Sequence, residues 1–167
     1  EPRGEPASRE YLLWLHMEFC KRLPEDMRSL ENPVTKKRTR LIPGKLREGE
    51  VAVGLHLPPR PQSLDRFLAR FEEAFASGHP SRMDRIAMLG AAHHRLLWIH
   101  PFFDGNGRVA RLMSHAMLRR LGVGGPLWSV ARGLARRGGD YKALLQNADE
   151  RRAGDLDGRG NLSEQAL

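Results

Sequence analysis

Apolar residues recur at helical spacing over four long segments of the chain, which predicts a mostly α-helical fold. The segments are residues 8–23, 64–75, 83–99 and 106–121. Ser8 and Ser63 stand at the start of the first two and are of a type preferred at a helix N-cap, while Pro24 ends the first. Shorter helical stretches follow residue 126. We therefore expect a single domain with about six to eight helices.

The pattern changes to alternation between residues 51 and 57, where apolar residues alternate with small or polar ones. The apolar residues are Val51, Val53, Leu55 and Leu57. Turn residues precede this run at 48–50 and Pro58 ends it, so the sequence predicts a short β-hairpin. Two strands are only marginally stable alone, and the hairpin should therefore pack on the helices and keep one open edge.

The composition fits one folded domain, because the chain has 167 residues of which 40% are hydrophobic. Cys20 is the sole cysteine, so no internal disulfide can form. No apolar run has the length of a membrane span or the layout of a signal peptide, and we expect a cytoplasmic protein with no membrane partner. The sequence starts without methionine and has polar ends, which indicates that its termini are truncated from a longer protein.

The net charge of +8 and a pI near 10.5 raise the question of an anionic ligand or partner. Residues 36–47 carry six basic side chains and no acidic one. We interpret them as a solvated loop, with a surface for an acidic partner or a phosphate as the alternative. A basic chain is typical of nucleic-acid binding, but the same charge can serve an anionic nucleotide. Charge alone does not decide between the two.

The residue types that carry chemistry are concentrated between the two central helical segments, in residues 100–111, which read HPFFDGNGRVAR. Pro101 disfavours the helical conformation for the residue before it, so His100 should end the helix that begins near residue 83. The imidazole is the one side chain nearby that takes up a proton near neutral pH. His100 is therefore the natural general base for a hydroxyl group that attacks a phosphate.

The next helix should begin near Asn106, which is a favourable N-cap residue. As the cap it would leave the amides of residues 107–109 free at the positive end of the helix, where an anion binds. Gly105 and Gly107 lack the side chains that would keep a phosphate away from the backbone. We therefore expect a polyphosphate site at this helix end.

Three charged side chains extend this site. Arg108 and Arg111 are three residues apart and lie off the apolar stripe, so both can reach the phosphates from one helix edge. Asp104 would repel a phosphate directly, but a carboxylate beside a phosphate site is suited to hold Mg²⁺.

These residues match the signature H-x-F-x-[D/E]-G-N-G-R-x-x-R at every fixed position, and by them the chain resembles the Fic domain family. The resemblance implies a mostly α-helical, single Fic-like domain over residues 1–167 with a short β-hairpin flap, and its core spans about residues 44–148. It also implies an enzyme, a nucleotidyltransferase that moves AMP from ATP, with Mg²⁺, to a Tyr, Ser or Thr hydroxyl of a target protein.

The resemblance gives each residue of the motif a role. His100 would be the general base and Asp104 the Mg²⁺ ligand. The implied nucleotide-binding residues are Gly105, Asn106, Gly107, Arg108, Arg111 and Tyr141. The first three would hold the α- and β-phosphates, the two arginines the outer phosphates, and the tyrosine, which opens a later short helix, the nucleoside base.

Two partners are implied as well. An extended segment of the target protein would dock on the edge of the flap near Val51–Leu57, unless this is an ordinary structural hairpin. Many family members also carry an inhibitory helix, [S/T]-x-x-x-[E/D]-[G/N], whose acidic residue pairs with the second arginine of the motif. No Ser or Thr of this sequence has an acidic residue four positions later. The inhibitory helix would come from a missing terminus or another chain, or be absent.

Other functions are compatible with the same residues. The same site could transfer another nucleotide or a phosphate, or remove AMP. The basic runs leave a non-catalytic nucleic-acid or protein-binding module as the alternative, although such a module does not need His100 beside a phosphate site. The glycine spacing also fits a dinucleotide fingerprint, but a helix rather than a strand precedes it. His93 and His94 have the wrong spacing for a metal site with His100, so a core or supporting role is expected.

Overall fold

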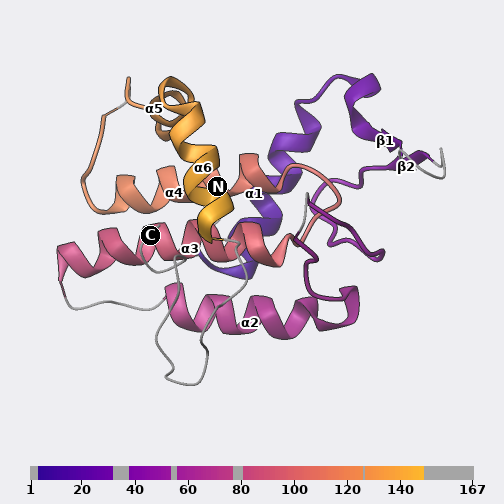
Figure 1. The fold of residues 1–167 in the computed structure, drawn as a ribbon, viewed down its shortest axis with the longest axis horizontal. Coiled ribbons are helices and arrows are strands. Elements are labelled where there is room, and N and C mark those ends of the chain that lie inside the picture. Colours follow the sequence, from indigo (N-terminus) through magenta and orange to yellow (C-terminus); the bar gives the residue numbers. More distant parts are fainter. Residues whose placement is uncertain (1–3, 32–37, 54–55, 77–80, 126, 149–167) are drawn as a thin grey trace.

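The structure is a computed structural model that describes residues 4–31, 38–53, 56–76, 81–125 and 127–148. These residues form six α-helices and one two-stranded sheet, which confirms the expected mostly α-helical domain (Figure 1). The helices are α1 (Arg9–Lys21), α2 (Leu64–Phe75), α3 (Arg82–Ile99), α4 (Asn106–Arg120), α5 (Val130–Arg136) and α6 (Gly138–Ala148), and the strands are β1 (Ser29–Glu31) and β2 (Arg38–Arg40). None of the helices in this part of the chain is long and apolar enough to cross a membrane.

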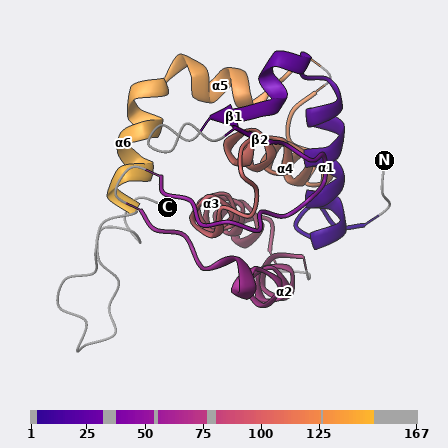
Figure 2. The same ribbon diagram turned by 90° about the vertical axis from the view of Figure 1, so that its right-hand side faces the viewer.

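Helices α3 and α4 pack side by side at the centre of the domain (Figures 1 and 2). Helix α2 packs on α3 and α1 on α4, while α5 and α6 lie on the remaining side (Figure 2). The core contains large side chains that are at most 2% exposed, namely Leu12, Leu68, Phe71, Leu96, Ile99, Phe102, Val109 and Met113. Phe102 belongs to the loop between α3 and α4, so this loop is anchored in the most buried part of the domain.

The beginnings of the first two long helices differ in how they are capped. Ser8 accepts a hydrogen bond from the Tyr11 amide at 3.2 Å, so the predicted cap of α1 is confirmed. Ser63 makes no side-chain cap bond, because the 3-10 turn Pro61–Ser63 leads directly into α2. The predicted cap at Ser63 is therefore wrong, although the helix begins where it was expected.

The hairpin predicted at residues 51–57 is not confirmed as a pair of strands. The described backbone forms a single antiparallel bridge there, in which Val53 and His56 exchange two hydrogen bonds of 3.0 Å. Residues 54 and 55, at the tip of the predicted hairpin, lie outside the described residues. The strand pair that the described residues do form is β1 with β2, earlier in the chain.

Arg47 corrects the prediction of a solvated basic loop. Its guanidinium donates hydrogen bonds to the carbonyls of Gly49, at 3.0 Å, and Pro59. These carbonyls flank the predicted hairpin. Arg47 is only 2% exposed, and β2 takes up another part of the predicted loop. Residues 36 and 37 lie outside the described residues.

Candidate active site

His100 follows α3 in a left-handed backbone conformation. Its φ and ψ are 50° and 59°, and it is the one residue other than glycine with a positive φ in the described part of the chain. Its amide still donates to the Leu96 carbonyl at 3.0 Å. Because Pro101 disfavours the right-handed conformation at the preceding position, α3 ends at the residue that the sequence indicated.

The imidazole of His100 is neutral and offers one acceptor nitrogen. Nδ1 lies 3.3 Å from the carbonyl oxygen of Leu97, which can only accept, so Nδ1 carries the proton and Nε2 the lone pair. Burial lowers the pKa of His100 below its ordinary value of 6.5, and the nearby Arg47 and His56 act in the same direction. The Leu97 carbonyl and Asp104 raise the pKa without outweighing burial. His100 can therefore take up a proton at Nε2 at neutral pH.

Arg47 holds the backbone around His100. Its Nε donates to the His100 carbonyl at 2.7 Å, and its amide donates to the Pro101 carbonyl at 2.9 Å. Through its bonds to Gly49 and Pro59, the same guanidinium ties the end of α3 to the segments on both sides of residues 51–57. No pattern in the sequence indicates this role, because a basic run such as the one around Arg47 is typical of a solvated loop.

Asn106 closes the loop between α3 and α4 and does not cap α4. Its Oδ1 accepts from the Phe102 amide at 3.0 Å, and its Nδ2 donates to the Phe102 carbonyl at 2.8 Å. The side chain is 2% exposed. The N-cap is Gly105, whose φ is 83°. The prediction of an Asn106 cap is wrong, because the Asn106 carboxamide bonds to Phe102 instead.

The N-terminus of α4 offers fewer free amides than the sequence led us to expect. The amides of Arg108 and Val109 donate to the Gly105 carbonyl at 3.0 and 2.9 Å, so the expectation that they are free is wrong. The amides of Asn106 and Gly107 have no acceptor among the described residues. Together with the positive end of the helix dipole, these two amides are the backbone donors that an anion can reach.

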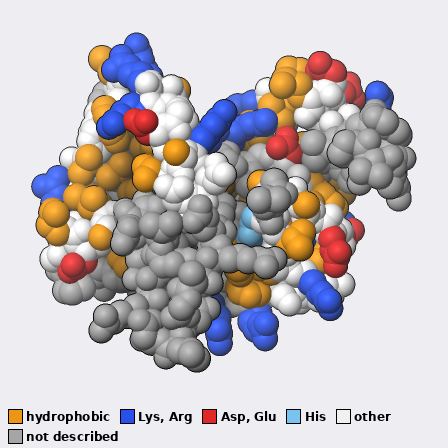
Figure 3. Space-filling model, in the orientation of Figure 1, with side chains coloured by type: hydrophobic (Ala, Val, Ile, Leu, Met, Phe, Trp, Pro, Cys, Tyr) orange, Lys and Arg blue, Asp and Glu red, His pale blue; other side chains and the backbone are white. Residues whose placement is uncertain are grey.

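Arg108 and Arg111 approach this helix end from different directions. The Arg108 guanidinium lies 4.7 Å from the centre of the Phe19 ring on α1. A Cβ at Gly105 would lie 3.0 Å from the same ring and would force it to shift, and the φ of 83° also disfavours other residues there. Arg111 folds back over Gly107, with Nη1 3.2 Å from where a Cβ would stand. On the face shown in Figure 3, Lys and Arg side chains gather above the centre of the view, and part of a histidine is visible below them.

Asp104 presents a carboxylate that is 34% exposed, with Oδ2 3.7 Å from the Arg108 guanidinium. No group of three or more His, Cys, Asp or Glu side chains that could hold a metal occurs in the part of the chain that the structure describes. Mg²⁺ usually takes one or two protein carboxylates, and substrate phosphates and water complete its shell. Asp104 therefore fits a Mg²⁺ that is shared with a nucleotide, rather than a site built from protein alone.

A buried histidine of α1, which no motif indicated, fixes the backbone at Asp104. His16 Nδ1 accepts from the Gly44 amide at 3.0 Å, so its Nε2 carries the proton and donates to the Asp104 carbonyl at 3.3 Å. The ring stacks on Phe102, with 3.9 Å between centroids and 3° between planes. His16 therefore supports the loop through its neutral form.

We expect His16 to make the stability of the fold depend on pH. Burial lowers its pKa from 6.5 to about 4, so below pH 6.5 the unfolded chain takes up a proton that the folded protein does not. The free energy of unfolding should therefore fall as the pH is lowered from 6.5 towards 4. His16→Gln keeps a donor towards Asp104 and does not titrate, so it should reduce this slope. Urea unfolding over this pH range measures it, and equal slopes in parent and variant would contradict the expectation.

Tyr141 on α6 contacts His93 on α3. Its hydroxyl lies 2.8 Å from His93 Nε2. Burial raises the pKa of Tyr141 above its ordinary value, although the positive charge of Arg111 acts in the opposite direction. The tyrosine also borders an apolar cavity of about 210 Å³ between α3, α5 and α6, whose other walls include Leu89, Val130, Leu134 and Leu145.

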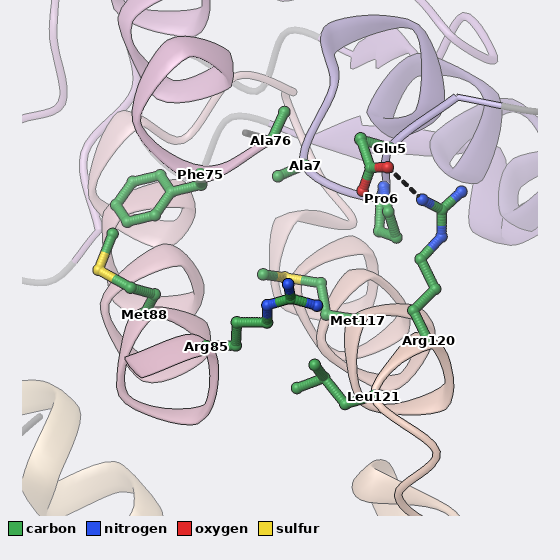
Figure 4. A pocket seen from close by; sticks show the side chains of 10 residues that line it. All are labelled: Glu5, Pro6, Ala7, Phe75, Ala76, Arg85, Met88, Met117, Arg120 and Leu121. Carbon is green, nitrogen blue, oxygen red and sulfur yellow. Dashed lines mark hydrogen bonds and ion pairs between the residues drawn. The ribbon is translucent and has the colours of Figure 1, made fainter. Parts of the chain in front are cut away.

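A second cavity of about 480 Å³ lies at the far ends of α3 and α4 (Figure 4). Arg85 and Met88 line it from the first turns of α3, and Met117 lines it from the last turn of α4. An ion pair between Glu5 and Arg120 forms part of its rim. His100 and the N-terminus of α4 stand at the opposite ends of these helices, so this cavity is not part of the candidate active site.

Comparisons with known proteins agree with the motif. A family model described as Fic/DOC family matches residues 6–118. The protein adenylyltransferase Fic of Drosophila ananassae is 43% identical over 79 residues, which are 47% of this chain and 16% of that protein. The protein of the same name from Drosophila melanogaster is 42% identical over a match of the same extent. A solved structure of a Fic domain containing signaling protein from Bacteroides thetaiotaomicron covers 95% of this chain and 57% of its own, with 19% identity and a TM-score of 0.47. The match therefore spans a small part of the length of the Drosophila proteins.

Proposed function

Since the chain belongs to the Fic/DOC family, we propose that it is an enzyme that transfers AMP from ATP to the hydroxyl group of a Tyr, Ser or Thr side chain in a protein. One observation carries the proposal. The neutral imidazole of His100 has Nε2 as an acceptor, and a short loop joins it to the N-terminus of α4, where free amides and two arginines lie. The name of the Drosophila relatives, protein adenylyltransferase, supports the same activity.

In the proposed reaction His100 Nε2 takes the proton of the acceptor hydroxyl while the hydroxyl oxygen attacks the α-phosphorus of ATP. A bond forms between that oxygen and the α-phosphorus, the bond from the α-phosphorus to the bridging oxygen breaks, and pyrophosphate leaves. A general base needs a fixed position relative to the nucleophile, and the hydrogen bonds from Arg47 and to Leu97 hold His100 in place.

The helix end would hold the phosphates. The amides of Asn106 and Gly107 are placed to bind the α- and β-phosphates, and Arg108 and Arg111 the outer ones. Mg²⁺ bound through Asp104 would offset the charge of the phosphates. The apolar cavity beside Tyr141 is our proposed site for the nucleoside base. Sites for such ligands have mainly apolar walls with a few polar groups that fix the orientation of the ligand.

We place the protein substrate along residues 51–57. His56 Nε2 donates to the carbonyl of Trp98 at 2.8 Å. Trp98 is two residues before His100 in α3, so this bond holds the segment close to the proposed base. Leu57 and Val53 are 78% and 44% exposed, so apolar side chains are open to a partner beside the base. An extended peptide could bind there by adding a strand to the exposed backbone.

The pH dependence of the transfer rate follows from the pKa of His100. Because burial lowers this pKa, the base is already unprotonated at neutral pH, and kcat/KM should be constant from about pH 7 to 8. The rate should fall only on the acid side, with a midpoint below 6.5, the ordinary pKa of histidine. Initial rates across this range test the expectation, with circular dichroism at each pH to correct for unfolding. A midpoint above about pH 7 would remove His100 as the base.

The activity is tested by incubating the purified chain with Mg²⁺, a cell extract and each of the four ribonucleoside triphosphates, labelled at the α-phosphorus. We expect labelled protein with ATP. Label from a different nucleotide would keep the chemistry and change the substrate. If no nucleotide gives label, and the chain instead binds a nucleic acid selectively at physiological salt, the non-catalytic alternative replaces this proposal.

A further inference from the structure

Two exposed arginines lie over aromatic rings on the surface that the adjacent helices α2 and α3 share (Figure 1). The guanidinium of Arg95 on α3 is 5.2 Å from the centre of the Trp98 ring, and that of Arg66 on α2 is 5.7 Å from the centre of the Phe67 ring. The two rings contact each other, with 5.6 Å between their centroids. The four side chains therefore form one continuous cluster.

This cluster adjoins the segment along which we place the protein substrate. His56 packs on Trp98 with 5.6 Å between ring centroids, and its Nε2 bonds to the Trp98 carbonyl. Arg95 is five residues before His100, which is about 7.5 Å along α3 at about 1.5 Å per residue. A peptide in strand conformation covers about 3.3 Å per residue. A segment bound along residues 51–57 can therefore reach the cluster within a few residues of its acceptor hydroxyl.

Neither arginine of the cluster has an acidic partner among the residues that the structure describes. Two acidic residues of α2 are used within the fold instead. Asp65 forms an ion pair with Arg9 at 2.6 Å, and Glu72 accepts from the Arg9 amide at 3.1 Å. A guanidinium packed on a ring still presents N–H groups around its edge, where a carboxylate can accept two parallel bonds. The ring also restricts the side chain, so less rotamer freedom is lost on binding.

The surroundings of Trp98 favour an acidic protein segment over a single-stranded nucleic acid. Surfaces for single strands stack the bases on open aromatic faces. The Trp98 ring is half-buried, and Arg95, His56 and Phe67 all pack against it. The guanidinium groups, rather than the ring, are therefore the part of the cluster that a partner can reach.

We propose that Arg66 and Arg95 bind acidic side chains of the protein substrate near the hydroxyl group that is modified, and so favour targets whose acceptor stands in an acidic segment. This inference rests on the proposed function and names the class of substrate for the same site. Exposed ion pairs are weak and depend on salt. The two arginines therefore select among targets, while strand addition along residues 51–57 supplies the common contacts.

The binding test uses two fluorescent peptides with the same central strand-forming segment, which contains one Tyr, one Ser and one Thr. One peptide has Glu and Asp on both sides of this segment, and the other has Gln and Asn at the same positions. Anisotropy without nucleotide gives the dissociation constants, so the result does not depend on transfer. At low salt the parent should bind the acidic peptide about three- to tenfold more tightly, and this preference should shrink at physiological salt.

Two double variants show which arginines cause the preference. Arg66→Gln combined with Arg95→Gln should remove it. The matched control combines Arg82→Gln with Arg119→Gln, which changes exposed arginines in the first turn of α3 and the last turn of α4. Both double variants have the same net charge, so a preference caused by overall charge alone would fall equally in the two. If the first double variant does not fold, its two single variants replace it, and each should lose part of the preference.

Transfer of AMP to the acidic peptide is the second measurement. The Arg66→Gln, Arg95→Gln protein should show a raised KM and an unchanged kcat, because neither arginine contacts the reacting groups. A parent with no preference, or an equal loss in both double variants, would overturn the inference, and AMP transfer by the parent would still support the proposed function.

Two further results would separate the surface from the activity. A preference that depends on Arg66 and Arg95, in a protein that labels no target from ATP, would support the acidic-peptide surface and remove the proposed function. A labelled oligothymidylate that binds the parent more tightly than the acidic peptide, and loses this affinity in the Arg66→Gln, Arg95→Gln protein, would overturn the inference in favour of a nucleic acid.

Discussion

Replacing His100 by asparagine should lower the rate of AMP transfer by about 10²–10⁴-fold, the usual cost of losing a general base. Asparagine is preferred to alanine because it tolerates the left-handed backbone, where φ is 50°. Its carboxamide cannot take up the proton. The affinity for ATP should change little, because the proposed phosphate contacts come from α4. Single-turnover transfer and calorimetric ATP binding measure the two effects separately.

The matched control is His115→Asn. His115 lies further along α4, where its ring stacks on Trp128 with 6.1 Å between centroids. It makes no contact with the proposed site among the described residues, so its variant should transfer AMP at the parent rate. A His100→Asn protein that is folded, binds ATP and keeps the parent rate would show that the base is another group.

Replacing Arg47 by methionine should have the largest effect on stability. Methionine fills part of the space of the arginine stem, but the carbonyls of His100, Gly49 and Pro59 lose their donor. The three bonds are only partly buried, so each acceptor left without its partner should cost about 1 kcal/mol, the lower end of the range for buried groups, and we expect a loss of about 3 kcal/mol. In a chain of this size that lowers the melting temperature by about 6–12 °C. Transfer should also fall about tenfold below that temperature, because His100 is no longer held.

The control for this variant is Arg40→Met, which removes the same charge from an exposed position in β2. It should leave the melting temperature and the transfer rate near those of the parent. Calorimetric melting and transfer rates at a temperature where both variants are folded give the comparison. If Arg47→Met melts with the parent, Arg47 does not hold the loop as we describe.

The parts of the site that are contiguous in the sequence could be predicted from it. The end of α3 at His100 follows from a local rule about proline, and the start of α4 from its apolar spacing. The hydrogen bonds at the start of α4 depend on tertiary packing and could not be predicted from local sequence rules. Asn106 is a good cap by type, but Phe102 lies where it can bond to both ends of the carboxamide, so Gly105 became the cap.

The supporting residues could not be predicted, because their partners are remote in the chain. Arg47 bonds to a carbonyl 53 residues away, and His16 to one 88 residues away. No short pattern marks either residue, and the basic run around Arg47 favoured a solvated loop.

The central claim is that this chain transfers AMP, with His100 as the base. The most direct measurement incubates the chain and its His100→Asn variant with Mg²⁺, a cell extract and ATP labelled either at the α- or at the γ-phosphorus. We expect protein to be labelled from the α-phosphorus only. The His100→Asn variant should label protein far more slowly than the parent chain. Protein labelled from the γ-phosphorus would contradict the account, because phosphate rather than AMP would then be the group transferred.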